Sequence, residues 1–424
     1  MQDQQRLPPV WVMGLTNGVW GMLGGFSVVT VPEMLAAEGV SGGRIAAFVA
    51  TLMWPMVLGA LVSPMLDVRF SRRAYALAMA SIVFLSIMLT VLFGAHVEWI
   101  RWVLLLGWAA GSLYQGAVGG WMGSLIRKQD DTRLGIWMTV SNTGAGGLLM
   151  FSGSEILRHF STATAALLLA AIITSPILLF FFIPAPGPDR KLAGESFRQF
   201  SADVSALLRQ PKVLVSLALF ILPAGSFSLT NVLGGLGKSF SAGERLVSDI
   251  SGIGAILAGL AGSFALQPLA KLLPLRPLYL AIGITGAIFT LSLLLLPHSP
   301  ALYALAITGE NIFQALEFAA ANAIAFETMG PGNPLAATLF TVLIAVSTLP
   351  IMYMGYADAA AYAWRGVFGA FLIDGSLGLT ACVVLWVALR KQWTRGQELD
   401  AHQPPAAHPH HQPQAAPPQP TVEG

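Results

Sequence analysis

The sequence predicts an all-α integral membrane protein with twelve transmembrane helices, arranged as two pseudo-symmetric six-helix bundles. Three observations lead to this prediction: the composition, the number of long apolar runs, and a weak internal repeat. Of the 424 residues, 55% are hydrophobic and only 10% are charged, and the mean hydropathy is +0.68. An ordinary soluble domain has about a quarter of its residues charged. The composition therefore excludes a soluble enzyme.

Apolar runs long enough to cross a membrane recur along the chain. A bilayer core of about 30 Å needs about 20 apolar residues per helix. Lipid offers no partner for backbone polar groups, and the runs lack the alternation of barrel strands, so each run is expected to be a helix. The predicted spans are 10–37, 43–66, 74–95, 101–126, 134–157, 162–183, 212–237, 247–270, 277–297, 301–327, 335–358 and 366–389.

The orientation follows from the basic residues, which accumulate in cytoplasmic loops. If the N-terminus is cytoplasmic, seventeen of the 23 Lys and Arg residues fall on the cytoplasmic side, and an odd number of spans would destroy this asymmetry. The polar segment before the first span lacks the features of a cleaved signal peptide. We therefore expect a multi-pass protein of the cell inner (cytoplasmic) membrane with both termini in the cytoplasm.

The longest connection, 184–211, separates six spans from six. It carries an amphipathic stretch with apolar residues at helical spacing, namely Phe197, Phe200, Val204 and Leu207. At an offset of 204 residues, identical residues recur in the two halves, namely Pro64 with Pro268, Arg72 with Arg276 and Tyr75 with Tyr279. Such an offset is what a duplicated transporter requires. The predicted parts are a cytoplasmic N-terminus 1–9, bundles 10–183 and 212–390, a linker 184–211 and a disordered tail 391–424.

A charged motif follows the second span. It reads Ser63-Pro64-Met65-Leu66-Asp67 and continues with Arg69, Arg72 and Arg73. An acid at this place can dock against a helix N-terminus or pair with Arg72 or Arg73, and each such contact stabilises by about 0.3–1 kcal/mol when exposed. Asp67, Arg72 and Arg73 are therefore candidate gating residues. The alternative is that these charges only fix the topology, which is sufficient for Arg69.

The motif resembles the loop signature of the major facilitator superfamily. Its Ser-Pro-x-x-Asp form and the pair Glu310-Asn311 are similar to the anhydromuropeptide permease branch, which also contains siderophore importers. The resemblance implies two bundles that rock around a cavity lined by the first, fourth, seventh and tenth spans. It also implies that Asp67 contacts the start of the eleventh span, after Pro334. The family's loop glycine is Ser63 here, and its acids in the fourth span are Gly116 and Gly120, so the substrate is not carried over.

The tenth span carries a polar stripe. Glu310 lies about 15 Å below the membrane surface at 1.5 Å per residue, with Asn311 beside it and Gln314 and Glu317 at helical spacing. An ionised side chain at mid-bilayer costs about 2.5–3.5 kcal/mol, so the stripe must face protein or water. One interpretation is a hydrogen-bond network that packs helices. The other is a hydrated cavity in which Glu310 or Glu317 exchanges the coupling proton.

Asp374 is the other deep acid of the C-terminal half, and a second titrating site and a packing role are both open for it. Four further acids, Glu33, Glu155, Glu327 and Asp358, fall near span ends, where the membrane interface explains them.

Uncharged candidates for lining the solute cavity occur in both halves: Asn17, Trp20, Tyr114, Gln115, Asn142, Ser226 and Asn231, with Asn311 and Gln314. For each, an interhelical hydrogen bond or an interfacial position is the alternative. The glycines of the fourth span predict close helix packing.

The sequence therefore predicts a secondary active transporter. We expect it to take up, together with protons, a small polar or amphipathic solute that resembles a muropeptide, a siderophore or a sugar. The net charge of +2 offers no surface for nucleic acid, and no nucleotide-binding motif occurs. His408, His410 and His411 could bind a divalent metal, but in a tail without predicted structure we expect no metal site. We expect no enzyme activity and no cofactor. The expected partners are the solute, protons and membrane lipid, and we expect a monomer. A non-transporting membrane sensor and an exporter are the alternatives.

Overall fold

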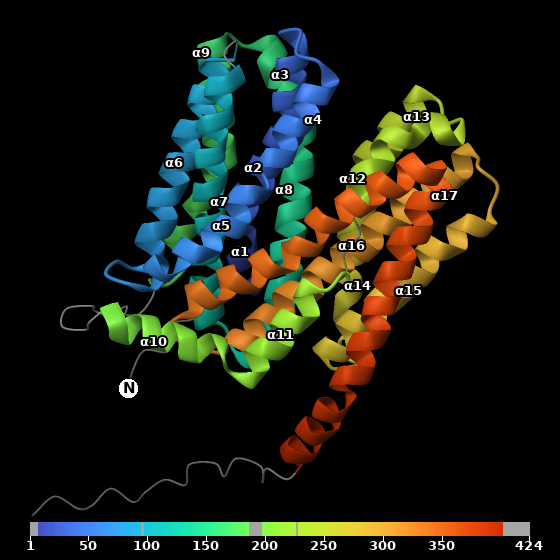
Figure 1. Cartoon of the computed structure of the whole chain (residues 1–424). Helices are drawn as coiled ribbons and strands as arrows, with labels where there is room; N and C mark the ends of the chain where they lie inside the picture. The colour runs from blue at the N-terminus through green and yellow to red at the C-terminus, as the bar shows by residue number, and fades with distance from the viewer. Residues whose placement is uncertain (1–6, 95–96, 186–196, 226–227, 402–424) are drawn as a thin grey trace, which may run out of the picture.

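The computed structural model describes residues 7–94, 97–185, 197–225 and 228–401 (Figure 1). Every regular element in these residues is a helix, as the sequence predicts. Large apolar side chains are exposed on many helices; Leu61 is 79% exposed and Leu295 is 87% exposed. Water would not stabilise such a surface, whereas lipid does. The chain is an all-helical, multi-pass membrane protein.

The N-terminal half consists of the following helices, in chain order: α1 (Val10–Leu15), α2 (Gly18–Gly25), η1 (Phe26–Thr30), α3 (Val31–Ala37), α4 (Gly42–Thr51), α5 (Trp54–Val62), η2 (Ser63–Asp67), α6 (Arg72–Leu92), α7 (Val97–Leu125), η3 (Lys128–Asp130), α8 (Asp131–His159), α9 (Thr162–Thr174) and η4 (Ser175–Phe182).

The C-terminal half begins after the linker helix α10 (Phe197–Leu208). It consists of α11 (Pro211–Ile221), α12 (Thr230–Leu233), η5 (Gly234–Phe240), α13 (Glu244–Asp249), η6 (Ile250–Gly254), α14 (Ala255–Leu269), α15 (Leu275–Ser292), η7 (Leu293–Leu295), α16 (Pro300–Met329) and α17 (Ala336–Ala401).

Each predicted span overlaps one helix or a run of consecutive helices. By length and apolarity, seven segments of the described chain are able to cross a membrane, and a bent pair, Ser201–Leu208 with Pro211–Ile221 at 69°, would be the eighth. The long helices α7, α8 and α16 are not among the seven. These three helices carry glycines and polar residues that other helices cover, so their composition is less apolar than that of a lipid-facing helix.

Two predicted span boundaries need comment. Within α17, Arg365 and Gly366 leave helical geometry, and Gly366 has φ +59°, which glycine adopts without strain. This break separates the predicted spans 335–358 and 366–389. The predicted continuous span 212–237, in contrast, is wrong. α11 ends at Ile221 because Pro223 forces Leu222 into an extended conformation (φ −88°, ψ 154°), and α12 begins only at Thr230.

The linker helix matches the sequence prediction in part of its length. α10 covers the amphipathic stretch, and Val204 and Leu207 pack against the core, while the side chains of 197–200 lie outside the described residues. α17 continues to Ala401, past the predicted end of the last span. The remainder of the predicted disordered tail, 402–424, and the linker residues 186–196 lie outside the described residues.

The two halves meet closely along α7. An added Cβ would collide with Thr341 at Gly116, with Phe340 at Gly119, and with the backbone of Ala337 at Gly120. The close helix packing predicted from these glycines is therefore confirmed. In Figure 1 the halves cross near the lower end, beside α10 and α11, and the ends that carry α3 and α13 point apart.

Candidate functional site

Asp67 joins the two halves. Its carboxylate is fully buried and accepts hydrogen bonds from the backbone N–H groups of Ala337 (3.1 Å) and Thr338 (2.7 Å) and from the Thr338 hydroxyl (2.7 Å). The first N–H groups of a helix have no intrahelical partner and carry the positive end of the helix dipole. Asp67 in the N-terminal half therefore caps α17 of the C-terminal half.

Arg72 completes this contact. Its Nε donates to Asp67 Oδ1 (2.8 Å), and its Nη2 donates to the carbonyl oxygens of Asn333 (3.2 Å) and Pro334 (3.1 Å). The guanidinium is thus bonded to both halves. Arg73 takes no part in these bonds; its guanidinium lies 6.0 Å from the ring centre of Trp121, over the ring face.

Local sequence places Asp67 at this point. Ser63 and Pro64 end α5, and the tighter helix η2 carries the chain to Asp67. Arg69 then has φ +68°, a left-handed conformation that reverses the chain, so that α6 begins at Arg72. Opposite, Asn333 accepts from the N–H of Leu335 and precedes Pro334, which positions the start of α17. The contact expected between Asp67 and the residues after Pro334 is present.

A small hollow of about 10 Å³ lies between the halves next to this contact. It is lined by Met56, Ser112, Gln115, Gly116, Phe340, Thr341, Ile344 and Ala345. Gln115, a candidate cavity residue, is thus at the interface between the halves.

Both acids of the tenth predicted span point towards α15. Glu310 is fully buried and accepts from the Thr290 hydroxyl (2.6 Å). Glu317 is 1% exposed and accepts from the Tyr279 hydroxyl (2.8 Å). The second carboxylate oxygen of each acid is buried without a hydrogen-bond partner. Among the ion pairs of the described residues, none includes either acid.

The neighbouring amides have other partners. The Gln314 side chain donates to the Thr230 hydroxyl at the start of α12 (2.7 Å), and Asn311 donates to the backbone carbonyl of Ile307 in its own helix (2.8 Å). The stripe therefore meets two elements: both acids contact α15, and Gln314 and Glu317 also contact the broken seventh span.

Asp374 and Asp358 converge. The Ser228 hydroxyl contacts Asp358 Oδ2 at very short range and lies 3.3 Å from Asp374 Oδ1. The interfacial position predicted for Asp358 is wrong, because this residue is fully buried and its helix continues beyond the predicted end at 358. Asp358 and Asp374 lie at nearly equal distances in sequence from the break at Gly366, a spacing that brings them together in an antiparallel pair.

The other three acids near span ends are placed as expected. Glu33 is exposed, Glu155 pairs with Arg158 at the surface (3.1 Å), and Glu327 pairs with Arg276 (2.7 Å). Arg276 is the repeat partner of Arg72, so the two matched arginines both make an ion pair next to the start of a helix.

Three neutral candidates of the N-terminal half, Asn17, Tyr114 and Trp20, make contacts inside that half. Asn17 donates to the carbonyl of Met138 in α8 (3.3 Å), and the Tyr114 hydroxyl donates to the carbonyl of Thr16 (2.7 Å). Trp20 packs edge-to-face on Trp108, with ring centres 5.0 Å apart. These contacts match the packing interpretation. Asn142 is half-buried beside Gly21. Ser226 and the side chain of Asn231 lie outside the described residues.

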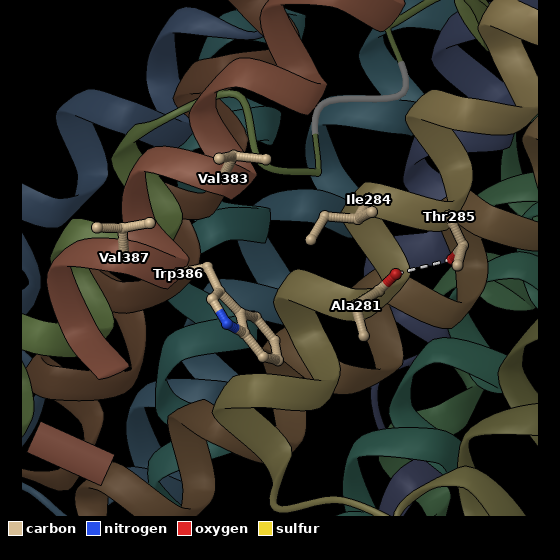
Figure 2. A pocket seen from close by; sticks show the side chains of 6 residues that line it. All are labelled: Ala281, Ile284, Thr285, Val383, Trp386 and Val387. Atoms are coloured by element: carbon tan, nitrogen blue, oxygen red, sulfur yellow. Dashed lines mark hydrogen bonds between the residues drawn. The ribbon is translucent and has the colours of Figure 1, made fainter. Parts of the chain in front are cut away.

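A larger groove lies away from all of these residues. Figure 2 shows it between α15 and α17, with a volume of about 260 Å³ and a lining of Ala281, Ile284, Thr285, Val383, Trp386 and Val387. The Thr285 hydroxyl is bonded to the Ala281 carbonyl of its own helix (2.8 Å), so the groove presents an apolar surface. Such a lining suits lipid better than a polar solute.

The fold matches known transporter structures at low sequence identity. No protein-family model matches the chain, and no curated protein sequence matches it. The human organic anion transporter MFSD10 (TETRAN) superposes with a TM-score of 0.68 at 15% identity, over 89% of this chain and 100% of that one. The major facilitator superfamily proton:xylose symporter XylE superposes with a TM-score of 0.66 at 14% identity, over 89% and 95%.

A bacterial homologue of the iron transporter ferroportin, in an outward-facing state, superposes with a TM-score of 0.66 at 13% identity, over 91% of this chain and 98% of that one. The chain therefore has the fold of major facilitator transporters. This is the fold that the resemblance in the sequence implies, while membership of the superfamily and of the anhydromuropeptide permease branch stays a prediction.

Proposed function

We propose that the chain is a secondary active transporter of the major facilitator type, which takes up a small polar or amphipathic solute with protons by alternating access. In this proposal it has twelve membrane-spanning helices in two bundles, 10–183 and 212–390, both termini are cytoplasmic, and it works as a monomer in the inner membrane without a cofactor. Muropeptides, siderophores and sugars are the solute classes to test first.

The observation that carries the proposal is the contact of Asp67 and Arg72 with the start of α17. It is a compact set of charged hydrogen bonds between the two halves, which also meet through close packing and a hydrogen bond from Asn322 to Thr139. Such a contact exists in one state and is broken in the other, which makes it a conformational switch. In the proposed orientation the basic loops lie in the cytoplasm, and this contact then closes the cytoplasmic side, as in an outward-facing transporter.

Proton coupling is supported by Glu310 and Glu317. Each is buried in the C-terminal half, accepts one hydroxyl hydrogen bond and makes no ion pair among the described residues. A dry carboxyl group without a counter-ion is most stable with a proton bound. A proton can leave when the half moves and water enters. XylE, whose fold is similar, is a proton symporter.

Purified protein in sealed vesicles tests the proposal. Glu310→Gln or Glu317→Gln should abolish accumulation driven by a pH gradient and leave solute exchange intact, because exchange needs no net proton movement. Glu155→Gln, which changes a surface acid paired with Arg158, is the matched control and should keep both activities.

Full pH-driven uptake by both Gln variants would defeat the assignment of the coupling proton to these two acids and leave Asp374 as the candidate. Loss of both transport modes together with lowered thermal stability would indicate a packing role. If the wild-type protein binds solute but moves none in either direction, it is a sensor on a transporter scaffold, and net outward movement would make it an exporter.

A further inference from the structure

The irregular part of the seventh span meets buried acids at two separate places. Gly225 packs against the carboxyl group of Glu317 so closely that an added Cβ would collide with it. Ser228 contacts Asp358 and Asp374, which come from the two arms of α17. Thr230, which follows directly, accepts from Gln314. The described residues of this segment thus contact Glu317, Gln314 and Asp374, which are candidates for transport, and also Asp358.

The surroundings of Asp358 and Asp374 are apolar. Leu229, Ala370 and Phe371 belong to one buried cluster, and all are at most 1% exposed. Asp358 is fully buried and Asp374 is 6% exposed. Glu310 of α16, which is also an acid, faces Asp358. No ion pair of the described residues includes Asp358.

The hydrogen count at Ser228 restricts the charge of the pair. A serine hydroxyl has one hydrogen and donates one hydrogen bond, yet its Oγ lies within hydrogen-bond distance of both carboxyl groups. If both acids were ionised, one of these contacts would set an oxygen lone pair against a negative oxygen. If one acid keeps its proton, that acid donates to Oγ and the hydroxyl donates to the other acid. Two like charges this close in an apolar site also favour a shared proton.

A second observation points to the same site. Asp358 Oδ1 and Glu310 Oε2 are buried and have no hydrogen-bond partner. In an apolar interior, an oxygen without a hydrogen-bond partner raises the free energy of a charged carboxylate far more than that of a neutral carboxylic acid. A bound proton removes most of that cost.

We propose that Asp358, Ser228 and Asp374 form a proton-binding site in which the two carboxyl groups hold one proton between them. The proton moves on and off a carboxyl oxygen, so only an O–H bond forms or breaks. The use of this site in transport rests on the proposed proton coupling, through the segment that also contacts Glu317 and Gln314. That the site binds a proton does not depend on the proposed coupling.

Infrared spectroscopy of the purified full-length protein tests the site without solute or gradient. In sodium-free buffer at neutral pH, Asp358→Asn/Asp374→Asn should lose the protonated-carboxyl absorbance of one group relative to wild type, because the pair holds one proton. Because Glu310 faces Asp358, both samples, the reference included, carry Glu310→Gln, and Glu317 contributes equally to both. Glu155→Gln should lose none, since that surface acid is paired with Arg158.

A loss of no absorbance, or of two groups, would overturn the shared proton. Disappearance of the wild-type band on adding sodium chloride would also overturn it, in favour of a metal cation. If the double variant does not fold, Ser228→Ala gives the answer: loss of the hydroxyl should shift the band, and an unshifted band contradicts the proposal. If the wild-type protein shows the absorbance of one shared proton but no pH-driven uptake, the proposed coupling is wrong and this site remains. If the wild-type protein shows pH-driven uptake but lacks this absorbance, this site is wrong and the proposed coupling remains.

Discussion

Replacing Asp67 by Asn tests whether its contact holds the two halves together. The carboxylate accepts three hydrogen bonds from Ala337 and Thr338 and one from Arg72. The Asn side chain keeps the shape but removes the charge and sets an NH₂ donor against other donors. Arg72 loses its carboxylate partner and keeps its carbonyl acceptors, among them those of Asn333 and Pro334 on the other half.

The expected cost follows from these contacts. A buried hydrogen bond to a charged group contributes about 1.5–3 kcal/mol, and a charge at a partly buried helix terminus contributes up to about 2 kcal/mol. These contributions overlap, so a loss of about 3 kcal/mol is a reasonable total. Each 1.4 kcal/mol is a factor of ten, so the ratio of the closed to the open state of this end should fall about 100-fold.

Spin labels at Gln129 in the N-terminal half and Leu272 in the C-terminal half report the separation of this end. Both positions are exposed, and Cys382 is replaced by Ala so that no native thiol reacts. Asp67→Asn should add a population with a longer distance. Arg133→Gln, which removes an exposed charge paired with Asp130 inside one half, is the control and should leave the distances unchanged.

Distances that stay the same in Asp67→Asn, in a folded protein, would refute the reasoning. Asp67 would then serve only to fix the topology and to stabilise one fixed arrangement of the halves.

Two further predictions follow from the charge asymmetry and from the packing. Reporters fused after Arg6 and after Arg395 should both be cytoplasmic; a periplasmic C-terminal reporter would remove a span and contradict the two-bundle proposal. Gly120→Leu should force α7 away from the backbone of Ala337 and open the same end of the molecule, whereas Gly24→Leu has open space around it and should not. Equal spin-label distances in both glycine variants would show that the contact at Gly120 tolerates a side chain.

The sequence by itself determined the class of protein and its layout. Long apolar runs require helices in lipid whatever their neighbours are, so the all-helical membrane fold followed from composition, and each predicted span overlaps one helix or a run of helices. The residues alone left a helix N-terminus, Arg72 or Arg73 as partners of Asp67, and the start of the eleventh span was expected only from the resemblance of the loop motif to a known family. The prediction of a continuous helix over 212–237 was wrong. The helix breaks at Pro223, a local feature, but a count of apolar residues ignores where a proline interrupts the backbone hydrogen bonds.

Only the tertiary structure decided which polar side chains meet. Helical spacing places Glu310 and Glu317 on α16, but the facing residues Thr290 and Tyr279 belong to α15, and no periodicity within one helix reveals them. Asp358 was misplaced for the same reason. Its burial depends on where α17 turns and on Ser228 arriving from a broken helix more than a hundred residues earlier. In an apolar interior a buried acid is stabilised by its partners, and those partners come from distant parts of the chain.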